Sequence, residues 1–98
     1  MPERLIAVIT GASSGIGEAF ARQLAARGYD LLLAARRQDR LQHVAAQLSS
    51  AHGVSVEIFP ADLVEDSPRA ALAERMRTSS NFGLLVNNAG FEIGRAHV

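Results

Sequence analysis

Short apolar runs separate longer amphipathic segments along the chain. Runs of aliphatic residues at 5–9, 31–35 and 84–86 are typical of strands that are covered on both faces of a parallel sheet. The run at 54–59 alternates between apolar and polar residues at its start, as a strand nearer a sheet edge does. Pro60 then ends the capacity of this run to pair. The pattern predicts four β-strands.

The segments between these runs have the period of α-helices. In the first segment, Ile16, Phe20 and Leu24 recur four residues apart and predict a single apolar stripe. Gly28 suits the left-handed residue just past the end of this helix. The second helix is predicted over 38–50, where apolar residues stand at i, i+3, i+4 and i+7. These residues are Leu41, Val44, Ala45 and Leu48.

A third helix is predicted to begin with Asp66 or Ser67 as its cap, to carry Pro68 in its first turn and to end at about Thr78. Its apolar residues are Ala71, Leu72 and Met76. Strands that alternate with helices predict a parallel sheet with right-handed crossovers. We therefore expect a partial Rossmann fold of the α/β class, with strand order 3-2-1-4, helices on both faces and the C-terminal half missing.

The turn between the first strand and the first helix reads Thr-Gly-Ala-Ser-Ser-Gly-Ile-Gly. A side chain at Gly11 or Gly15 would hold a pyrophosphate away from the helix N-terminus, where free N–H groups favour negative charge. Gly17 would let the helix pack closely, and Ser13 and Ser14 add hydroxyl donors. An ordinary loop that leads into a helix is the alternative. The strand before and the helix after favour a dinucleotide site, and the P-loop motif is absent.

Three motifs together resemble those of the short-chain dehydrogenase/reductase family, in its compact single-domain branch. The spacing Gly-x-x-x-Gly-x-Gly in 10–17 is the first, and Asn-Asn-Ala-Gly at 87–90, after the fourth strand, is the second. The third is Asp-Leu at 62–63, after the third strand. The resemblance covers residues 5 to about 91 and implies an N-terminal fragment of such an enzyme.

The resemblance also implies the residues that contact the cofactor. For the adenosine ribose and the pyrophosphate these are Gly11, Ser13, Ser14, Ile16 and Gly17. Asp62 would accept a hydrogen bond from the adenine amino group, with the Leu63 backbone beside it. Asn88, Ala89 and Gly90 would lie along the adenine-ribose side. Asn87 is expected to be structural and to tie the fourth strand to the turn.

The end of the second strand indicates which nicotinamide cofactor is bound. Relatives that prefer NAD have an acidic residue there for the ribose 2′-hydroxyl, whereas this chain has Ala35, followed by Arg36 and Arg37. A guanidinium binds a 2′-phosphate in bidentate fashion. We predict NADP(H), with NAD less favoured, Arg36 as the main contact, and Arg37 or Ser13 as secondary contacts. Alternatively, these arginines and Arg40 merely solvate the start of a helix.

The family's chemistry requires a Tyr-x-x-x-Lys motif and a serine that polarises the carbonyl group. This chain has one tyrosine, Tyr29, with Leu33 four residues on, and it has no lysine. We therefore assign no catalytic residue. The predicted function is the cofactor-binding part of an oxidoreductase that transfers hydride between NADP(H) and a carbonyl or alcohol substrate. The alternative is a non-catalytic NADP(H)-binding or redox-sensing module.

Composition narrows the set of partners. Ten basic residues balance ten acidic ones, so we expect neither nucleic acid nor a membrane as a partner. The chain has no cysteine and only three scattered histidines, which argues against a metal site. No run approaches the ~20 apolar residues of a membrane span. We expect a cytoplasmic location, and a homo-oligomer for the full-length protein.

We interpret residues 1–91 as the N-terminal half of an NAD(P)-binding domain and 92–98 as a non-native tail. One back-translation of these last seven residues reads as a widely used sequencing adapter. Without the strands that the family has beyond Gly90, the fourth strand would be an exposed apolar edge. We therefore expect the isolated chain to be poorly stable, to bind cofactor weakly and to catalyse nothing.

Overall fold

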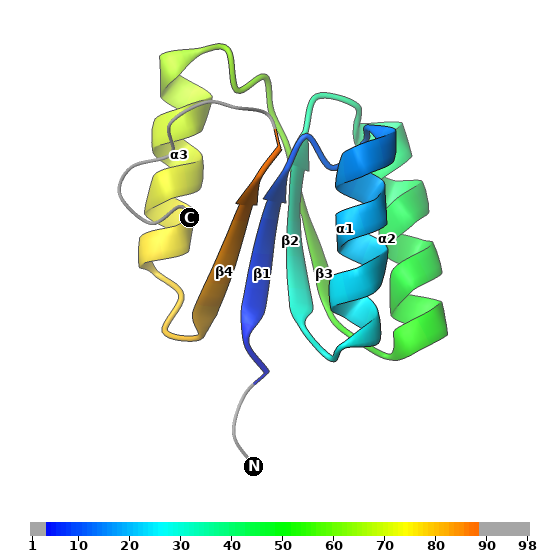
Figure 1. Cartoon of the computed structure of the whole chain (residues 1–98). Helices are drawn as coiled ribbons and strands as arrows, with labels where there is room; N and C mark the ends of the chain where they lie inside the picture. Colours follow the sequence, from blue (N-terminus) through cyan, green and yellow to red (C-terminus); the bar gives the residue numbers. More distant parts are fainter. Residues whose placement is uncertain (1–3, 89–98) are drawn as a thin grey trace.

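The computed structural model describes residues 4–88. Its strands are β1 (Ile6–Thr10), β2 (Asp30–Ala35), β3 (Val56–Pro60) and β4 (Phe82–Asn87). Its helices are α1 (Gly15–Ala26), α2 (Gln38–His52) and α3 (Asp66–Arg77). All strand pairs are parallel, and the order in the sheet is β3-β2-β1-β4, which confirms the predicted topology (Figure 1). The tail predicted at 92–98 lies outside the described residues.

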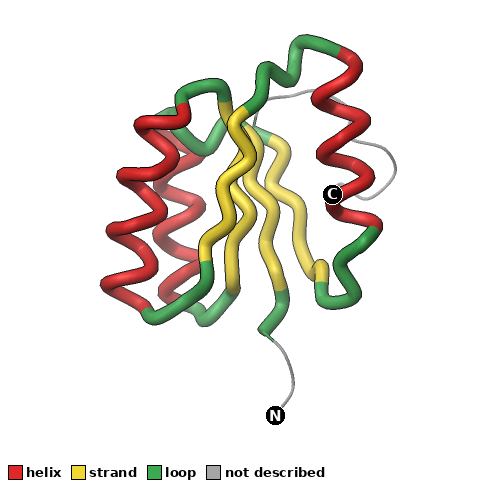
Figure 2. The backbone as a smooth tube through the Cα atoms, turned by 180° about the vertical axis from the view of Figure 1, so that it is seen from behind, coloured by secondary structure: helices red, strands yellow, loops and turns green. Residues whose placement is uncertain are grey.

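The sheet is covered on both faces, as predicted. Helices α1 and α2 lie on one face and α3 lies on the other, which Figure 2 shows from behind. Successive side chains of β1 point to opposite faces. Ala7 and Ile9 pack towards α1 and α2, whereas Val8 packs towards α3. This two-sided burial explains why β1 is apolar at consecutive positions.

The buried face of α1 differs from the predicted stripe. Its buried residues are Gly17, Ala21, Leu24 and Ala25. Ile16 is 66% exposed and Phe20 is 43% exposed, so only Leu24 of the predicted stripe lies in the core. The reason is steric, because small residues at positions 17, 21 and 25 allow the helix backbone to approach the sheet closely. Hydrophobic periodicity alone does not detect a face made of glycine and alanine.

Helix α2 follows its prediction more closely. Leu41, Val44 and Leu48 are buried and Ala45 is half-buried. The helix continues two residues beyond the predicted end, to His52, and Gly53 terminates it with φ +67°. Gly28, past the end of α1, has φ +91°, which confirms its predicted left-handed conformation.

The predicted start of α3 was wrong by one residue. The N-cap is Glu65, and no side chain makes a capping hydrogen bond there. Asp66 is the first residue of the helix, and its exposed carboxylate forms an ion pair with Arg69. Leu72 and Met76 are buried as predicted, whereas Ala71 is exposed.

Both outer strands match the predicted sheet edges. β3 pairs only with β2, and β4 pairs only with β1 among the described residues. Leu85 of β4 is buried, whereas Leu84 and Val86 are only half-buried on the face that α1 and α2 share. In the described part of the chain, β4 is therefore an apolar edge.

Candidate functional site

A cavity of about 370 Å³ opens at the carboxyl ends of β1, β2 and β3. It brings together seven residues that the sequence predicted as cofactor contacts: Gly11, Ser13, Ser14, Arg36, Arg37, Asp62 and Leu63. Ala35, Ala61 and Val64 complete the lining. Three segments far apart in the sequence therefore meet at one end of the sheet.

The glycine turn requires its glycines for different reasons. Gly11 has φ +63°, a conformation that residues with a side chain rarely adopt. A Cβ atom at Gly17 would lie 2.2 Å from the Gly11 carbonyl oxygen, so Gly17 permits the helix to start beneath the turn. A Cβ atom at Gly15 would meet nothing within 4 Å. The space beside Gly15 is thus open to a ligand.

Ser14 organises the start of α1. Its Oγ atom donates to Gly11 O at 2.9 Å and accepts from Gly17 N at 3.1 Å. Glu18 N donates to Ser14 O at 2.8 Å. Among the described residues, the amides of Gly15 and Ile16 have no hydrogen-bond partner at this helix N-terminus. Two N–H groups and the positive end of the helix dipole are therefore available to an anion.

The carboxyl end of β4 is joined to the glycine turn. Thr10 Oγ1 donates to Asn87 Oδ1 at 2.8 Å, in agreement with the structural role expected for Asn87. Asn88 Nδ2 donates to Gly11 O at 3.2 Å and to Ser14 Oγ at 2.9 Å. The Asn88 side chain thus stabilises the turn, a role that the sequence did not predict. Ala89 and Gly90 lie outside the described residues.

The loop after β3 forms another wall of the cavity. Asp62 is half-buried, and its Oδ1 atom accepts from Val64 N at 3.1 Å. Leu63 is buried in the core beneath α3. Arg69 donates to Leu63 O at 3.2 Å and to Val64 O at 3.3 Å. The loop is therefore fixed at its base by α3.

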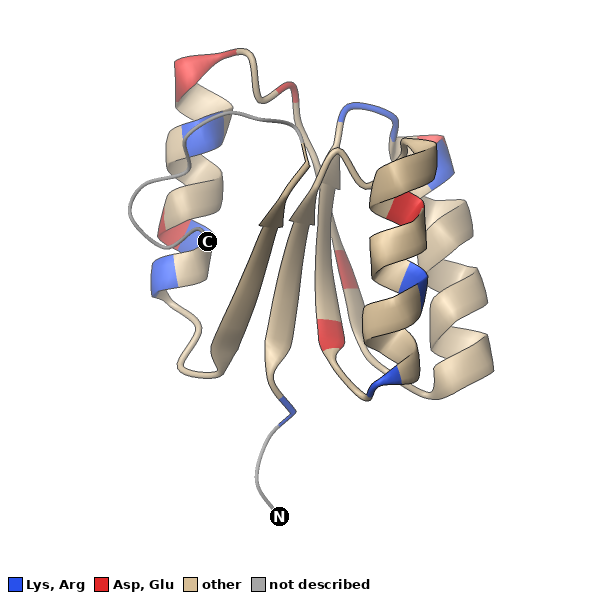
Figure 3. Ribbon diagram, in the orientation of Figure 1, with Lys and Arg blue, Asp and Glu red and all other residues tan. Residues whose placement is uncertain are grey.

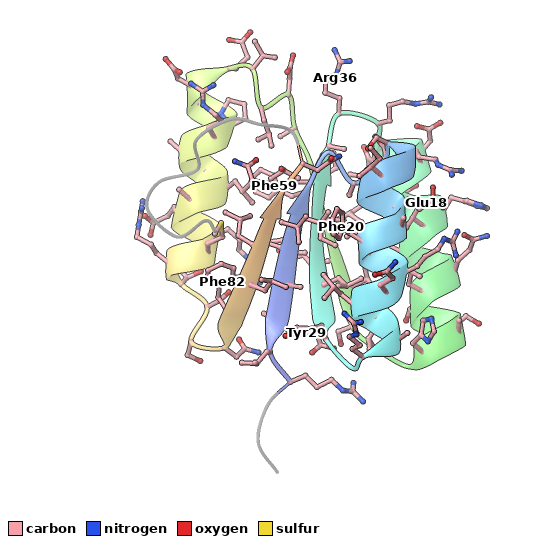
Figure 4. All side chains as sticks on the ribbon, in the orientation of Figure 1. Glu18, Phe20, Tyr29, Arg36, Phe59 and Phe82 are labelled. Carbon is pink, nitrogen blue, oxygen red and sulfur yellow. The ribbon has the colours of Figure 1, made fainter. Side chains whose placement is uncertain are left out.

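The arginines near the cavity differ in their partners. Arg37 forms an exposed ion pair with Asp39 at 3.3 Å and holds the pKa of that carboxyl below its usual value. Arg40 Nη2 donates to Glu18 Oε2 at 2.6 Å. Arg36 is exposed and has no hydrogen bond or ion pair with any described residue. Its side chain extends from the turn between β2 and α2, where Figure 3 shows positive charge at the end of the sheet and Figure 4 labels Arg36.

No role for Glu18 was predicted from the sequence. Its side chain is only 12% exposed and contacts both Arg22 and Arg40, each at 2.6 Å. The hydrogen bond from Arg22, together with the one from Arg40, lowers the pKa of the Glu18 carboxyl. The spacing of Glu18 and Arg22, four residues apart on a helix, indicated one of these contacts but not the other.

Three predicted contacts within the described residues do not line the cavity, and one of them, Asn88, hydrogen-bonds to the glycine turn instead. The Ile16 side chain is exposed on the first turn of α1, so only its backbone amide faces a potential anion. Gly17 is buried beneath the turn. Tyr29 packs against the core at the opposite end of the sheet, as Figure 4 shows.

Residues 4–88 contain no group of three or more His, Asp or Glu side chains that could hold a metal ion. None of the helices in this described range is long and apolar enough to cross a bilayer.

The sheet extends in both directions from β1, and the cavity lies outside the carboxyl ends of its strands. These two features define the class of doubly wound α/β proteins, which bind their ligands in such a crevice. A family model described as short chain dehydrogenase matches residues 5–97. The chain belongs to this family.

Individual relatives show how much of the family's length is present. The fatty acyl-CoA reductase of Acinetobacter baylyi is 41% identical over 92 residues, which make up 93% of this chain and 31% of that protein. The structure of a short-chain dehydrogenase from Sphingobium yanoikuyae in complex with NADPH superimposes with a TM-score of 0.84 and 46% identity. That match covers 89% of this chain and 34% of the other.

A second solved structure is L-sorbose reductase from Gluconobacter frateurii in complex with NADPH and L-sorbose. It matches with a TM-score of 0.81 and 40% identity, over 91% of this chain and 34% of that chain. The chain therefore spans about a third of the length of the relatives it resembles.

Proposed function

We propose that this chain is the NADP(H)-binding part of an oxidoreductase that transfers a hydride between NADP(H) and a carbonyl or alcohol substrate. The observation that carries the proposal is one cavity lined by the glycine turn, by Arg36 and by Asp62. These groups match three parts of NADP(H), namely the pyrophosphate, the 2′-phosphate and the adenine. The NADPH complexes of two similar structures support the same cofactor.

The free amides of Gly15 and Ile16, with the dipole of α1, would hold the pyrophosphate. Ser13, half-buried in the cavity wall, would donate to a neighbouring phosphate or ribose oxygen. Asp62 uses Oδ1 for Val64 N, so Oδ2 would accept from the adenine amino group. The bound nicotinamide would supply the hydride, and the residues described here would bind and orient the dinucleotide.

For the 2′-phosphate we assign Arg36 as the main contact. It lines the cavity and is not engaged by any described acidic side chain, so its guanidinium is available for a bidentate contact. Arg37 also lines the cavity but shares its charge with Asp39, which suits a secondary role. Position 35, at the end of β2, is alanine. No carboxylate at this position would therefore repel the 2′-phosphate.

The test is Arg36→Asp in the full chain, titrated with NADPH and with NADH while nicotinamide fluorescence is followed. We expect the affinity for NADPH to fall by roughly tenfold or more, because a charge-assisted contact is replaced by repulsion. Affinity for NADH should change little. Arg27→Asp is the matched control, since Arg27 is exposed near the other end of the sheet. Unchanged NADPH affinity in Arg36→Asp would refute the assignment.

A non-catalytic NADP(H)-binding or redox-sensing module is the second candidate function. The chain has no lysine, and its single tyrosine, Tyr29, lies at the end of the sheet opposite to the cavity. Because we expect this chain alone to catalyse nothing, the two candidates are distinguished in a longer reading frame that contains it. A Tyr-x-x-x-Lys motif in that frame, with loss of NADPH absorbance in the presence of ketones and aldehydes, would favour the enzyme. A longer frame that lacks the motif and binds NADPH without turnover would favour the module. The cytoplasmic location and the homo-oligomer expected from the sequence stay predictions.

A further inference from the structure

Glu18 joins the first turns of two helices. It lies in the first turn of α1, and its two carboxylate oxygens accept from different arginines. Arg22 is on the same helix, whereas Arg40 is in the first turn of α2. Arg22 also donates to Gln47 of α2 at 2.9 Å. This network, the Glu18 bridge, joins a side chain that is only 12% exposed to the arginines Arg22 and Arg40, which are 48% and 39% exposed.

The bridge provides a reason for a positive charge at an unfavourable place. A cation in the first turn of a helix is repelled by the helix dipole. Arg40 occupies that position in α2, and Glu18 neutralises it at 2.6 Å. The same carboxylate is favourably placed in the first turn of α1. The start of α2 is therefore attached electrostatically to the start of α1.

The turn that faces the cavity is held between this bridge and the sheet. β2 ends at Ala35 and α2 begins at Gln38, so only Arg36 and Arg37 connect them. Ala35 is fixed by the sheet, since Ala61 N donates to its carbonyl at 2.8 Å. With both ends anchored, a connection of two residues has little freedom to move.

Ion pairs engage two of the three arginines near the start of α2. Arg40 is bound to Glu18 and Arg37 is bound to Asp39. The third, Arg36, has no hydrogen-bond or ion-pair partner among residues 4–88, and it lines the cavity.

We propose that Glu18 is a positioning residue for cofactor specificity. By holding Arg40 and the start of α2, it keeps the Arg36 guanidinium where the 2′-phosphate of NADP(H) binds. This inference rests on the proposed function, because it requires that the cavity binds NADP(H). Glu18 contacts no part of the dinucleotide in this arrangement and acts only through the turn between β2 and α2.

The test compares the full chain with Glu18→Gln, Arg36→Gln and the double variant, and measures dissociation constants for NADPH and for NADH. Glu18→Gln should weaken NADPH binding by about fivefold and leave NADH binding unchanged within about twofold, as expected for residues coupled in one network. The double variant should bind NADPH no more weakly than Arg36→Gln alone. Charge alone predicts the opposite direction, because the loss of a carboxylate should tighten the binding of an anionic ligand.

Glu74→Gln is the matched control, since Glu74 pairs with Arg77 on the exposed surface of α3. If Glu18→Gln does not give a cooperative thermal transition, Arg40→Gln opens the same bridge from α2, and its ratio of NADPH to NADH affinity should fall in the same way. Equal losses for both cofactors, or unchanged or tighter NADPH binding, would overturn the inference. Native chain that binds neither dinucleotide would instead contradict the proposed function.

Discussion

Asn88 at the end of β4 donates a hydrogen bond to Ser14 Oγ at 2.9 Å, across 74 positions of the sequence. The same amide group donates to Gly11 O at 3.2 Å. Ser14 in turn holds the amide of Gly17. The conformation of the glycine turn, the start of α1 and the end of β4 are thus parts of one hydrogen-bonded unit. Changes at any of its members should affect both stability and dinucleotide binding.

Ser14→Ala should lower the free energy of unfolding by about 1–2 kcal/mol, because it removes an N-cap and an acceptor for the Asn88 amide. Urea denaturation followed by circular dichroism measures this difference. Ser67→Ala is the control, since Ser67 is exposed in α3 and makes no capping hydrogen bond. A cost for Ser14→Ala no larger than that for Ser67→Ala would contradict the capping role.

Two glycine substitutions should have opposite consequences for stability. In Gly17→Ala the new methyl group would lie 2.2 Å from the Gly11 carbonyl, so we expect a loss of several kcal/mol, as for other strained or overpacked sites. In Gly15→Ala the methyl group meets only open space, and stability should rise by about 0.5–1 kcal/mol. Thermal melts of the two variants measure the difference.

Gly15→Ala should nonetheless weaken the binding of NADPH and NADH alike, since its methyl group occupies the space proposed for the pyrophosphate. Titration of both cofactors against the stable variant tests this directly. A Gly15→Ala protein that binds both dinucleotides as tightly as the native chain would place the phosphates elsewhere.

Arg69→Gln should reduce the affinity for NADPH and for NADH by the same factor, about threefold to tenfold. Arg69 supports the carbonyl groups of Leu63 and Val64, which lie in the loop proposed to hold the adenine that both cofactors share. The affinity for AMP, measured by its competition with a fluorescent dinucleotide, should fall by a similar factor. A change in the ratio of the two affinities would show that Arg69 acts at the 2′-phosphate instead.

The Glu18 bridge should also make stability depend on pH. The arginines lower the pKa of the folded Glu18 carboxyl from its ordinary value of 4.5, so the bridge stabilises the native state fully above that value. This contribution should be lost as the pH falls below 4.5 and through the folded pKa. Denaturation at several pH values gives the free energy of unfolding of the native chain and of Glu18→Gln. The difference between these two free energies should be constant near neutrality and should shrink in acid. A difference that persists unchanged in acid would exclude the ionised carboxylate as its source.

Local pattern was sufficient for the elements and their order in the sheet. The apolar runs of β1 and β2 are continuous because both faces of a central parallel strand are covered, and this leaves a clear trace in the sequence. Parallel strands joined by right-handed crossovers then restrict the topology to few choices. The glycine spacing and the residues after each strand likewise pointed to the cavity lining.

The sequence by itself therefore determined the order of strands and helices, because this order follows from hydrophobic patterns that are local in the chain. It also determined which residue types stand at the carboxyl ends of the strands. Only the tertiary structure decided which face of α1 is buried, because close approach at Gly17 and Ala21 outweighed the greater hydrophobicity of Ile16 and Phe20. It also decided that Arg40 is held by Glu18 while Arg36 is left free, since side chains 22 residues apart meet only after α1 and α2 pack on the same face of the sheet.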